Sequence, residues 1–371
     1  MKNSRRSFIK KVGLSGALVA GGSLFLKGSS TSNNSIQVIK KPDSNFSFKN
    51  NKVPISLLID DGCPLVHVYW FHVKPIDGKG PFTKDGRLLV KSVPNSFMEK
   101  FCDVVTKNNI SGKLSIVPSP GGIGDIANGI PGYDNSLITE WINMANSRLS
   151  GRFDFSPEML THNHALDLKT GKYSEENEAE WSTKQDRTIL TPYLIHCLEI
   201  LKKAGINATG ITSPWDFGTK VEGEYTEAII AAQKEVYNHE LSWYFLHTVD
   251  DEPQKRPWIA LRKENCTLVS IASNMPDHFW PTIDSPKTDT EYINYIADKY
   301  ITANGKEGNI IDVLNAGGWP ILVTHWQSLF SNGLETGLNA LEEVGKRVNT
   351  HLKDRVEWNS CMDLTKLIVN Q

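Results

Sequence analysis

Cysteine is scarce in this sequence. Five cysteines occur among 371 residues, they are widely spaced, and there is no Cys-x-x-Cys pair. A disulfide scaffold needs dense cysteines, and a cysteine-ligated zinc site needs them in close pairs. Neither is therefore indicated, although one or two disulfide bridges stay open.

An excess of charge of one sign is also lacking. The chain has 40 basic and 42 acidic residues, for a net charge of −2 at pH 7. This balance offers no electrostatic argument for nucleic acid or an anionic membrane as a partner. Neither G-x-G-x-x-G nor G-x-x-x-x-G-K-[ST] occurs, so nucleotide binding is not indicated either.

The first thirty residues differ from the rest of the chain. "SRRSFIKK" precedes "VGLSGALVAGGSLFL", an apolar stretch too short to span a membrane comfortably. Arg5 and Arg6, followed by Ser-Phe-Ile-Lys, resemble a twin-arginine export signal. We expect residues 1–30 to direct export by the twin-arginine machinery and residues 31–52 to form a polar linker. The protein would then work in the periplasm or outside the cell, with the signal either cleaved or kept as a membrane anchor.

Residues 53–371 alternate apolar runs with amphipathic segments. The predicted strand "PISLLID" precedes a predicted helix over 96–109, and the strand "GKLSIVPSP" precedes a helix over 135–149. Roughly seven such units in about 310 residues predict one α/β domain, a distorted (β/α)7-type barrel with parallel strands. An open doubly wound sheet is the alternative.

Polar residues gather where the predicted strands end. The first strand ends in "DDG" (60–62), a later one runs into "EMLTHNHALD", another into "SPWDFG", and "PILVTHW" places His325 near its end. In a barrel these strand ends converge on one mouth. Carboxylates and imidazoles together suit a divalent metal such as Zn²⁺. His162 and His164 stand two residues apart, so on an extended segment they would face the same way as a ligand pair.

Each of these features also has a plainer explanation. The paired aspartates could cap a helix or fill a turn. His164 could be a solvated loop residue, and His325 could be an ordinary core or surface histidine.

Taken in order, the segments resemble the NodB-like polysaccharide deacetylases of the glycoside hydrolase/deacetylase superfamily. "LLIDDG" is similar to the family's strand–Asp–Asp–Gly motif, and "EMLTHNHALD" to its Glu-hydrophobic-x-x-His motif. "ITSPWDFG" is similar to its Pro-aromatic-Gly loop, and "PILVTHW" to its late hydrophobic-His motif. The resemblance spans residues 53–368.

The resemblance implies a secreted, metal-dependent hydrolase that removes acetyl groups from a polysaccharide or oligosaccharide. Asp60 would be the general base and His325 the general acid. Asp61 and His162 would hold a divalent metal at the mouth of the barrel.

The sequence departs from the family at the second metal histidine. Leu166 stands at that position, four residues after the first histidine, and His164 or Asp167 could substitute as a ligand. We take His164 as the predicted third ligand. The predicted substrate-binding residues are Trp215, Asp216, Asp167 and Trp326.

Two other functions stay open. A glycoside hydrolase on the same barrel would pair Asp60 with Asp216 or Glu158, about 5 Å apart if retaining or about 6.5–9.5 Å apart if inverting. A carbohydrate-binding relative without chemistry would keep an aromatic groove and no metal.

Overall fold

The computed structural model describes residues 52–75 and 80–371. The predicted export signal of residues 1–30 lies outside the described residues, as does the predicted linker except for its last residue. Within the described ranges, no helix is both long enough and apolar enough to cross a membrane.

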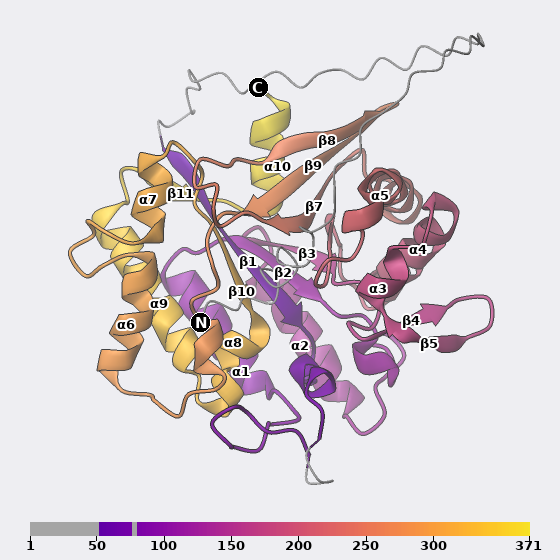
Figure 1. Cartoon of the computed structure of the whole chain (residues 1–371), viewed down its shortest axis with the longest axis horizontal. Helices are drawn as coiled ribbons and strands as arrows, with labels where there is room; N and C mark the ends of the chain where they lie inside the picture. The colour runs from indigo at the N-terminus through magenta and orange to yellow at the C-terminus, as the bar shows by residue number, and fades with distance from the viewer. Residues whose placement is uncertain (1–51, 76–79) are drawn as a thin grey trace, which may run out of the picture.

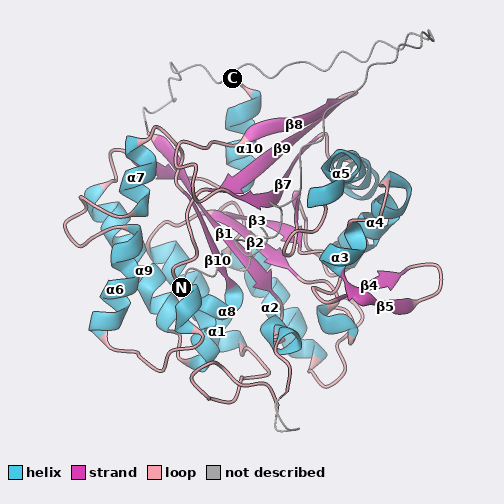
Figure 2. Cartoon of the chain, viewed as in Figure 1, coloured by secondary structure: helices cyan, strands magenta, loops and turns pink. Residues whose placement is uncertain are grey.

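Seven parallel strands of the described chain form a distorted barrel, which confirms the predicted fold class (Figures 1 and 2). The strands are β1 (Val53–Gly62), β2 (Gly112–Ile116), β3 (Phe153–Pro157), β6 (Gly210–Thr212), β7 (Leu241–Thr248), β9 (Cys266–Ser273) and β10 (Ile321–His325). Their order around the barrel is β10-β1-β2-β3-β6-β7-β9.

The ring of strands is interrupted at two places, which accounts for its distortion. Isolated parallel bridges, one of them between Glu158 and Thr212, take the place of a ladder between β3 and β6. Between β9 and β10, the Ser273 hydroxyl donates to the Ile321 carbonyl at 3.0 Å. The same carbonyl accepts from the Asn274 backbone N–H at 3.3 Å, so one side-chain and one backbone hydrogen bond stand in place of a continuous ladder.

Helices cover the outside of the barrel (Figure 2). Leu57 and Ile59 of β1 belong to the large core that the helices share, whereas Leu58 packs with Phe245 and Val323 inside the ring. This division follows from the alternation of side chains along a strand. The helices are α1 (Asn95–Lys107), α2 (Asn135–Arg148), α4 (Arg187–Lys203), α5 (Glu222–Tyr237), α6 (Thr290–Tyr300), α7 (Asn309–Asn315), α8 (Trp326–Phe330) and α9 (Thr336–His351).

The last segments of the chain close one end of the barrel. β11 (Val356–Trp358) pairs with the start of β1, and α10 (Cys361–Val369) follows it. Cys361 and Leu364 of α10 join the interior cluster with Leu58. Apolar side chains fill this end of the barrel. A polar site is therefore expected at the opposite end, where the parallel strands finish.

Several described elements were not expected from the sequence, among them the helices α7 and α8. β8 (Trp258–Lys263) runs antiparallel to β9 at the sheet edge. The hairpin of β4 (His164–Asp167) and β5 (Lys172–Asn177) projects from the body beside the short helix α3 (Glu178–Ser182) (Figure 1). β4, β5 and β8 have few buried side chains, so they lack the continuous apolar runs that mark the barrel strands.

A buried ion pair lies within the barrel. Lys113 of β2 is fully buried, and its ammonium binds the carboxylate of Asp60. The same ammonium donates to Thr212 Oγ1 at 3.0 Å and to the Ile59 carbonyl at 3.2 Å. These hydrogen bonds and the opposite charge compensate for removing the ammonium from water.

We expect Lys113→Met to lower the free energy of unfolding by about 3–5 kcal/mol, because it buries the Asp60 carboxylate without its ammonium. Urea denaturation measures the change. Lys107→Met is the matched control, since the exposed Lys107–Glu342 pair should contribute about 1 kcal/mol or less. Equal effects of the two substitutions would show that the Lys113–Asp60 pair does not stabilise the fold.

Candidate active site

Three buried side chains converge at the mouth of the barrel: Asp61, Glu158 and His162. One ligand atom from each lies within 4.8 Å of the other two. His162 Nε2 is 2.6 Å from Asp61 Oδ1 and 3.3 Å from Glu158 Oε1. We call these three residues the mouth cluster.

A bulge in β1 sends its two aspartates to different partners. The pairing of β1 with β2 shifts register between Ile59 and Gly62, and Asp61 has a left-handed φ of 64°. A bulge of this kind redirects a side chain that regular pleating would place elsewhere. Asp60 therefore reaches Lys113, while Asp61 turns to His162.

Backbone strain is concentrated around the mouth cluster. Besides Asp61, left-handed φ values occur at Met159 (46°), His162 (52°) and Trp215 (50°). Such conformations cost about 1 kcal/mol or more for residues other than glycine, and they persist where surrounding contacts hold them. Contacts with the surrounding structure must therefore hold these residues in their left-handed conformations.

Glu178 of α3 holds the strained segment that carries His162. Its fully buried carboxylate accepts hydrogen bonds from the backbone N–H groups of Leu160 and Thr161, both at 2.9 Å, and of His162 at 2.8 Å. The Tyr193 hydroxyl donates to the same carboxylate at 2.6 Å. Glu178 is thus a positioning residue that sets the direction of the His162 side chain.

Other polar groups orient the two carboxylates of the mouth cluster. Glu158 Oε2 accepts from the Asp61 backbone N–H at 2.5 Å and from the Ser115 hydroxyl at 2.6 Å. The Gln327 amide donates to Asp61 Oδ2. Each carboxylate thereby keeps one oxygen on a fixed donor while its other oxygen faces His162.

The charges of the mouth cluster perturb one another. Burial opposes a charge on His162, but the carboxylates of Asp61 and Glu158 hold its pKa well above the ordinary value. Burial would raise the pKa of Asp61, yet the His162 charge holds that pKa well below the usual range. Burial, together with the negative charges of Asp61 and Asp60, raises the pKa of Glu158.

The donor set of the mouth cluster fits a divalent cation. Two carboxylates and one imidazole supply hard and intermediate ligands of the kind that zinc and other first-row ions accept. Without a cation, a protonated His162 would offset the repulsion between the buried carboxylates of Asp61 and Glu158. A divalent ion would carry out the same neutralisation with more charge.

His325 and Asp277 form a second polar unit at the mouth. His325 ends β10, in register with Asp60 on β1, and its Nδ1 lies 2.8 Å from Asp277 Oδ2. Burial opposes the charge on His325, but the Asp277 hydrogen bond and the negative charge of Asp61 raise its pKa. Because Nδ1 is bound to Asp277, Nε2 is the ring nitrogen left available to a ligand.

Aromatic rings flank both polar units. The Trp215 ring is centred 4.5 Å from the His162 ring and 5.1 Å from the His72 ring. On the other unit, the Trp280 ring lies edge-on to His325 at 4.7 Å. Both tryptophans are partly exposed, so they offer apolar surface beside the polar groups. Asp216, which follows Trp215, is also partly exposed.

The structure does not bring His164 into the mouth cluster. His164 is exposed at the start of β4, paired with Asn177. The expectation of two imidazoles on one side assumed an extended segment, and the left-handed φ of His162 breaks that geometry. The third member of the cluster is instead Glu158, four residues before His162.

Two predicted substrate-binding residues also lie away from the mouth cluster. Asp167 is exposed at the end of β4, where its carboxylate accepts from the Lys169 backbone N–H at 2.8 Å. Trp326 is 1% exposed and packs against Phe97 and Phe101 in the core, so it has no free face for a ligand.

The sequence interpretation missed Asp277, Glu178 and Gln327. Asp277 and Glu178 lie outside every motif that was singled out, and Gln327 follows the late motif by one residue. No local pattern distinguishes them from other polar residues, because their roles come from contacts across the barrel. Glu158, by contrast, had a local signal in its four-residue spacing to His162.

The sequence matches no protein-family model and no curated protein. Among solved structures it is similar to a candidate polysaccharide deacetylase from Mycobacterium smegmatis, with 13% identity, a TM-score of 0.42 and coverage of 74% of this chain and 77% of that one. It is also similar to a GH57-type branching enzyme from Pyrococcus horikoshii (13%, 0.41, 85% and 70%) and a CE4 family pseudoenzyme from Bacillus anthracis (8%, 0.34, 85% and 66%).

We expect Glu178→Ala to lower the free energy of unfolding by about 3 kcal/mol, because three backbone N–H groups lose a buried charged acceptor. Urea denaturation checks this. Glu199→Ala on the exposed face of α4 is the control and should change stability by about 0.5 kcal/mol or less. A Glu178→Ala protein as stable as this control would argue against the positioning role.

Proposed function

We propose that this protein is a metal-dependent hydrolase that removes acetyl groups from a saccharide. The observation that carries the proposal is the mouth cluster of Asp61, Glu158 and His162, with the His325–Asp277 pair at the same mouth. A divalent cation held by the mouth cluster would polarise the acetyl carbonyl and the attacking water. Zinc is the proposed cation, because carboxylate and imidazole ligands suit it.

The chain's own residues supply the proton transfers. Asp60 accepts the proton of the attacking water, whose oxygen forms a bond to the acetyl carbon. When the bond to the departing amine or alkoxide breaks, His325 Nε2 donates its proton to that group. Asp277 keeps His325 in the orientation and protonation state that this second step requires.

The rings of Trp215 and Trp280 favour a sugar as the substrate. They flank His162 and His325 respectively, so a substrate held between them would present its acyl group to both polar units. An aromatic ring can cover the C–H face of a sugar while leaving its hydroxyl groups free for hydrogen bonds. We also propose that the protein is exported, on the basis of the twin-arginine pattern at residues 5–10.

The glycosidase alternative finds less support. It requires Asp60 to act with Asp216 or Glu158 as a pair of carboxylates. Glu158, however, accepts from the Asp61 backbone N–H and from Ser115, and its other oxygen faces His162, so it is already engaged within the mouth cluster. The absence of the family's second metal histidine would favour a binding protein without chemistry, but Glu158 supplies a third potential ligand beside Asp61 and His162.

We expect the purified protein to bind about one divalent ion per chain, measured by elemental analysis after dialysis against Zn²⁺ or Mn²⁺. Asp61→Ala, Glu158→Ala and His162→Ala should each weaken binding at least about 100-fold, because each removes one of three ligands.

His164→Ala is the matched control, since His164 is exposed two residues from His162 and should leave binding unchanged. Circular dichroism establishes that each variant is folded. A folded wild-type chain that takes up neither ion would overturn the metal-dependent function.

We expect Asp277→Asn to move the alkaline limit of kcat/KM to lower pH, because loss of the negative charge lowers the pKa of His325. His325→Ala should reduce kcat by about 10²–10⁴-fold. Acetate release from acetylated xylan and chitin oligomers provides the measurement. Asp284→Asn removes a charge from the same connection after β9 and should leave the pH profile in place. An unshifted profile in Asp277→Asn would refute the role of this pair.

A further inference from the structure

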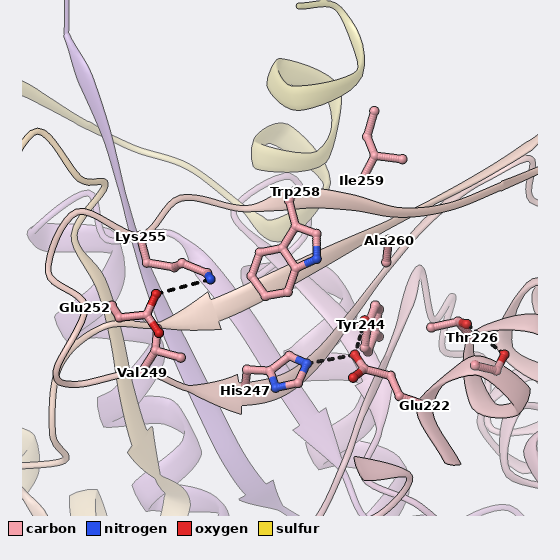
Figure 3. A pocket seen from close by; sticks show the side chains of 11 residues that line it. Glu222, Thr226, Tyr244, His247, Val249, Glu252, Lys255, Trp258, Ile259 and Ala260 are labelled. Carbon is pink, nitrogen blue, oxygen red and sulfur yellow. Dashed lines mark hydrogen bonds and ion pairs between the residues drawn. The ribbon is translucent and has the colours of Figure 1, made fainter. Parts of the chain in front are cut away.

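A cavity lies outside the mouth cluster. Its volume is about 580 Å³, within the range of small-molecule sites, and it lies between the first turn of α5, the end of β7 and β8 (Figure 3). Asp61, Glu158, His162 and His325 are not among its lining residues. Its polar and aromatic lining consists of Glu222, Tyr244, His247, Glu252, Lys255 and Trp258.

One side of this cavity presents a fixed carboxylate. Glu222 Oε1 accepts from the Tyr244 hydroxyl at 2.6 Å and lies 2.7 Å from His247 Nε2 (Figure 3). The hydrogen bond from His247 lowers the pKa of Glu222 against the opposing effect of partial burial. Glu222 is therefore a held, ionised acceptor for a donor group of a ligand.

The other side of the cavity presents an aromatic ring. Trp258 is partly exposed, and Figure 3 shows its indole extending from β8 toward His247, whose ring centre lies 5.6 Å away. The Lys255 ammonium lies 4.7 Å from the centre of the Trp258 ring and 3.3 Å from Glu252. Lys255 and Glu252 neutralise each other. When His247 is neutral, the lining of the cavity therefore has a negative net charge, which comes from Glu222.

These groups suit one chemical class of ligand. A neutral sugar has an apolar C–H face, which can pack on Trp258, and hydroxyl donors, which can bond to Glu222. The negative balance disfavours an anionic ligand. We propose that this cavity is a second saccharide-binding site, separate from the mouth cluster.

The second site is linked to the mouth through one connection. Residues 213–221 carry Trp215 beside His162 and lead directly into Glu222. If the proposed function holds, one extended saccharide would contact the mouth on one side of this connection and the cavity on the other. Saccharide binding in the cavity does not itself depend on the metal or on catalysis.

The test is a titration of protein labelled with 5-fluorotryptophan, followed by ¹⁹F NMR in the presence of EDTA. The resonance that disappears in Trp258→Phe is that of Trp258. Cellotriose or triacetylchitotriose should shift this resonance saturably, with a dissociation constant of about 10 mM or tighter. Because EDTA is present, the result is independent of whether the mouth cluster holds a metal.

Gly223→Leu is the blocking variant. A Cβ at Gly223 would meet nothing within 4 Å, and this residue lines the cavity on a helical turn, so a leucine should fill the space without disturbing the fold. We expect it to weaken binding at least about tenfold. Tyr295→Ala removes an exposed aromatic ring from α6 and is the matched control, with binding unchanged.

Three results would overturn the inference. One is the absence of a saturable shift of the Trp258 resonance with both saccharides. Another is binding by folded Gly223→Leu as tight as that of wild type. The third is equally tight binding of trigalacturonate, because an anionic sugar should be repelled by Glu222.

Discussion

The separation of two adjacent carboxylates at the end of β1 is the constraint on which the rest of the mouth depends. Asp60 and Asp61 are both buried, and two like charges so close together would raise the free energy of the fold if left alone. The bulge in β1 resolves this by giving each its own cation. Asp60 pairs with Lys113 inside the barrel, and Asp61 faces His162 at the mouth.

Holding His162 against Asp61 requires a strained segment, and the surrounding contacts supply the restraint. Glu178 binds three successive backbone N–H groups of that segment, ending with the one at His162. The Gln327 amide donates to Asp61 Oδ2, and Gln327 lies two residues after His325 on the chain. The mouth cluster and the His325–Asp277 pair therefore share a rigid support, which is the condition for a preorganised site.

Much of the architecture could be predicted from local sequence. Continuous apolar runs predicted the buried parallel strands, and their alternation with amphipathic helices predicted a barrel. The same sequence pattern located polar residues at the strand ends but did not predict which of these side chains contact one another. It expected His164 beside His162 because it assumed regular extended geometry, whereas a left-handed φ at His162 separates them. It expected Trp326 at the mouth, whereas the α8 helix turns this residue into the core.

The periodic pattern along the chain predicts the fold class and the strand ends at which chemistry could gather. Three pairings became evident only from the folded chain: Glu158 completes the cluster, Asp277 orients His325, and Lys113 neutralises Asp60. The physical reason is that burial patterns repeat locally along the chain, whereas the pairing of charges depends on side chains that meet across the barrel. Bulges and residues with a left-handed φ determine which side chains come into contact, and short sequence patterns do not encode these features.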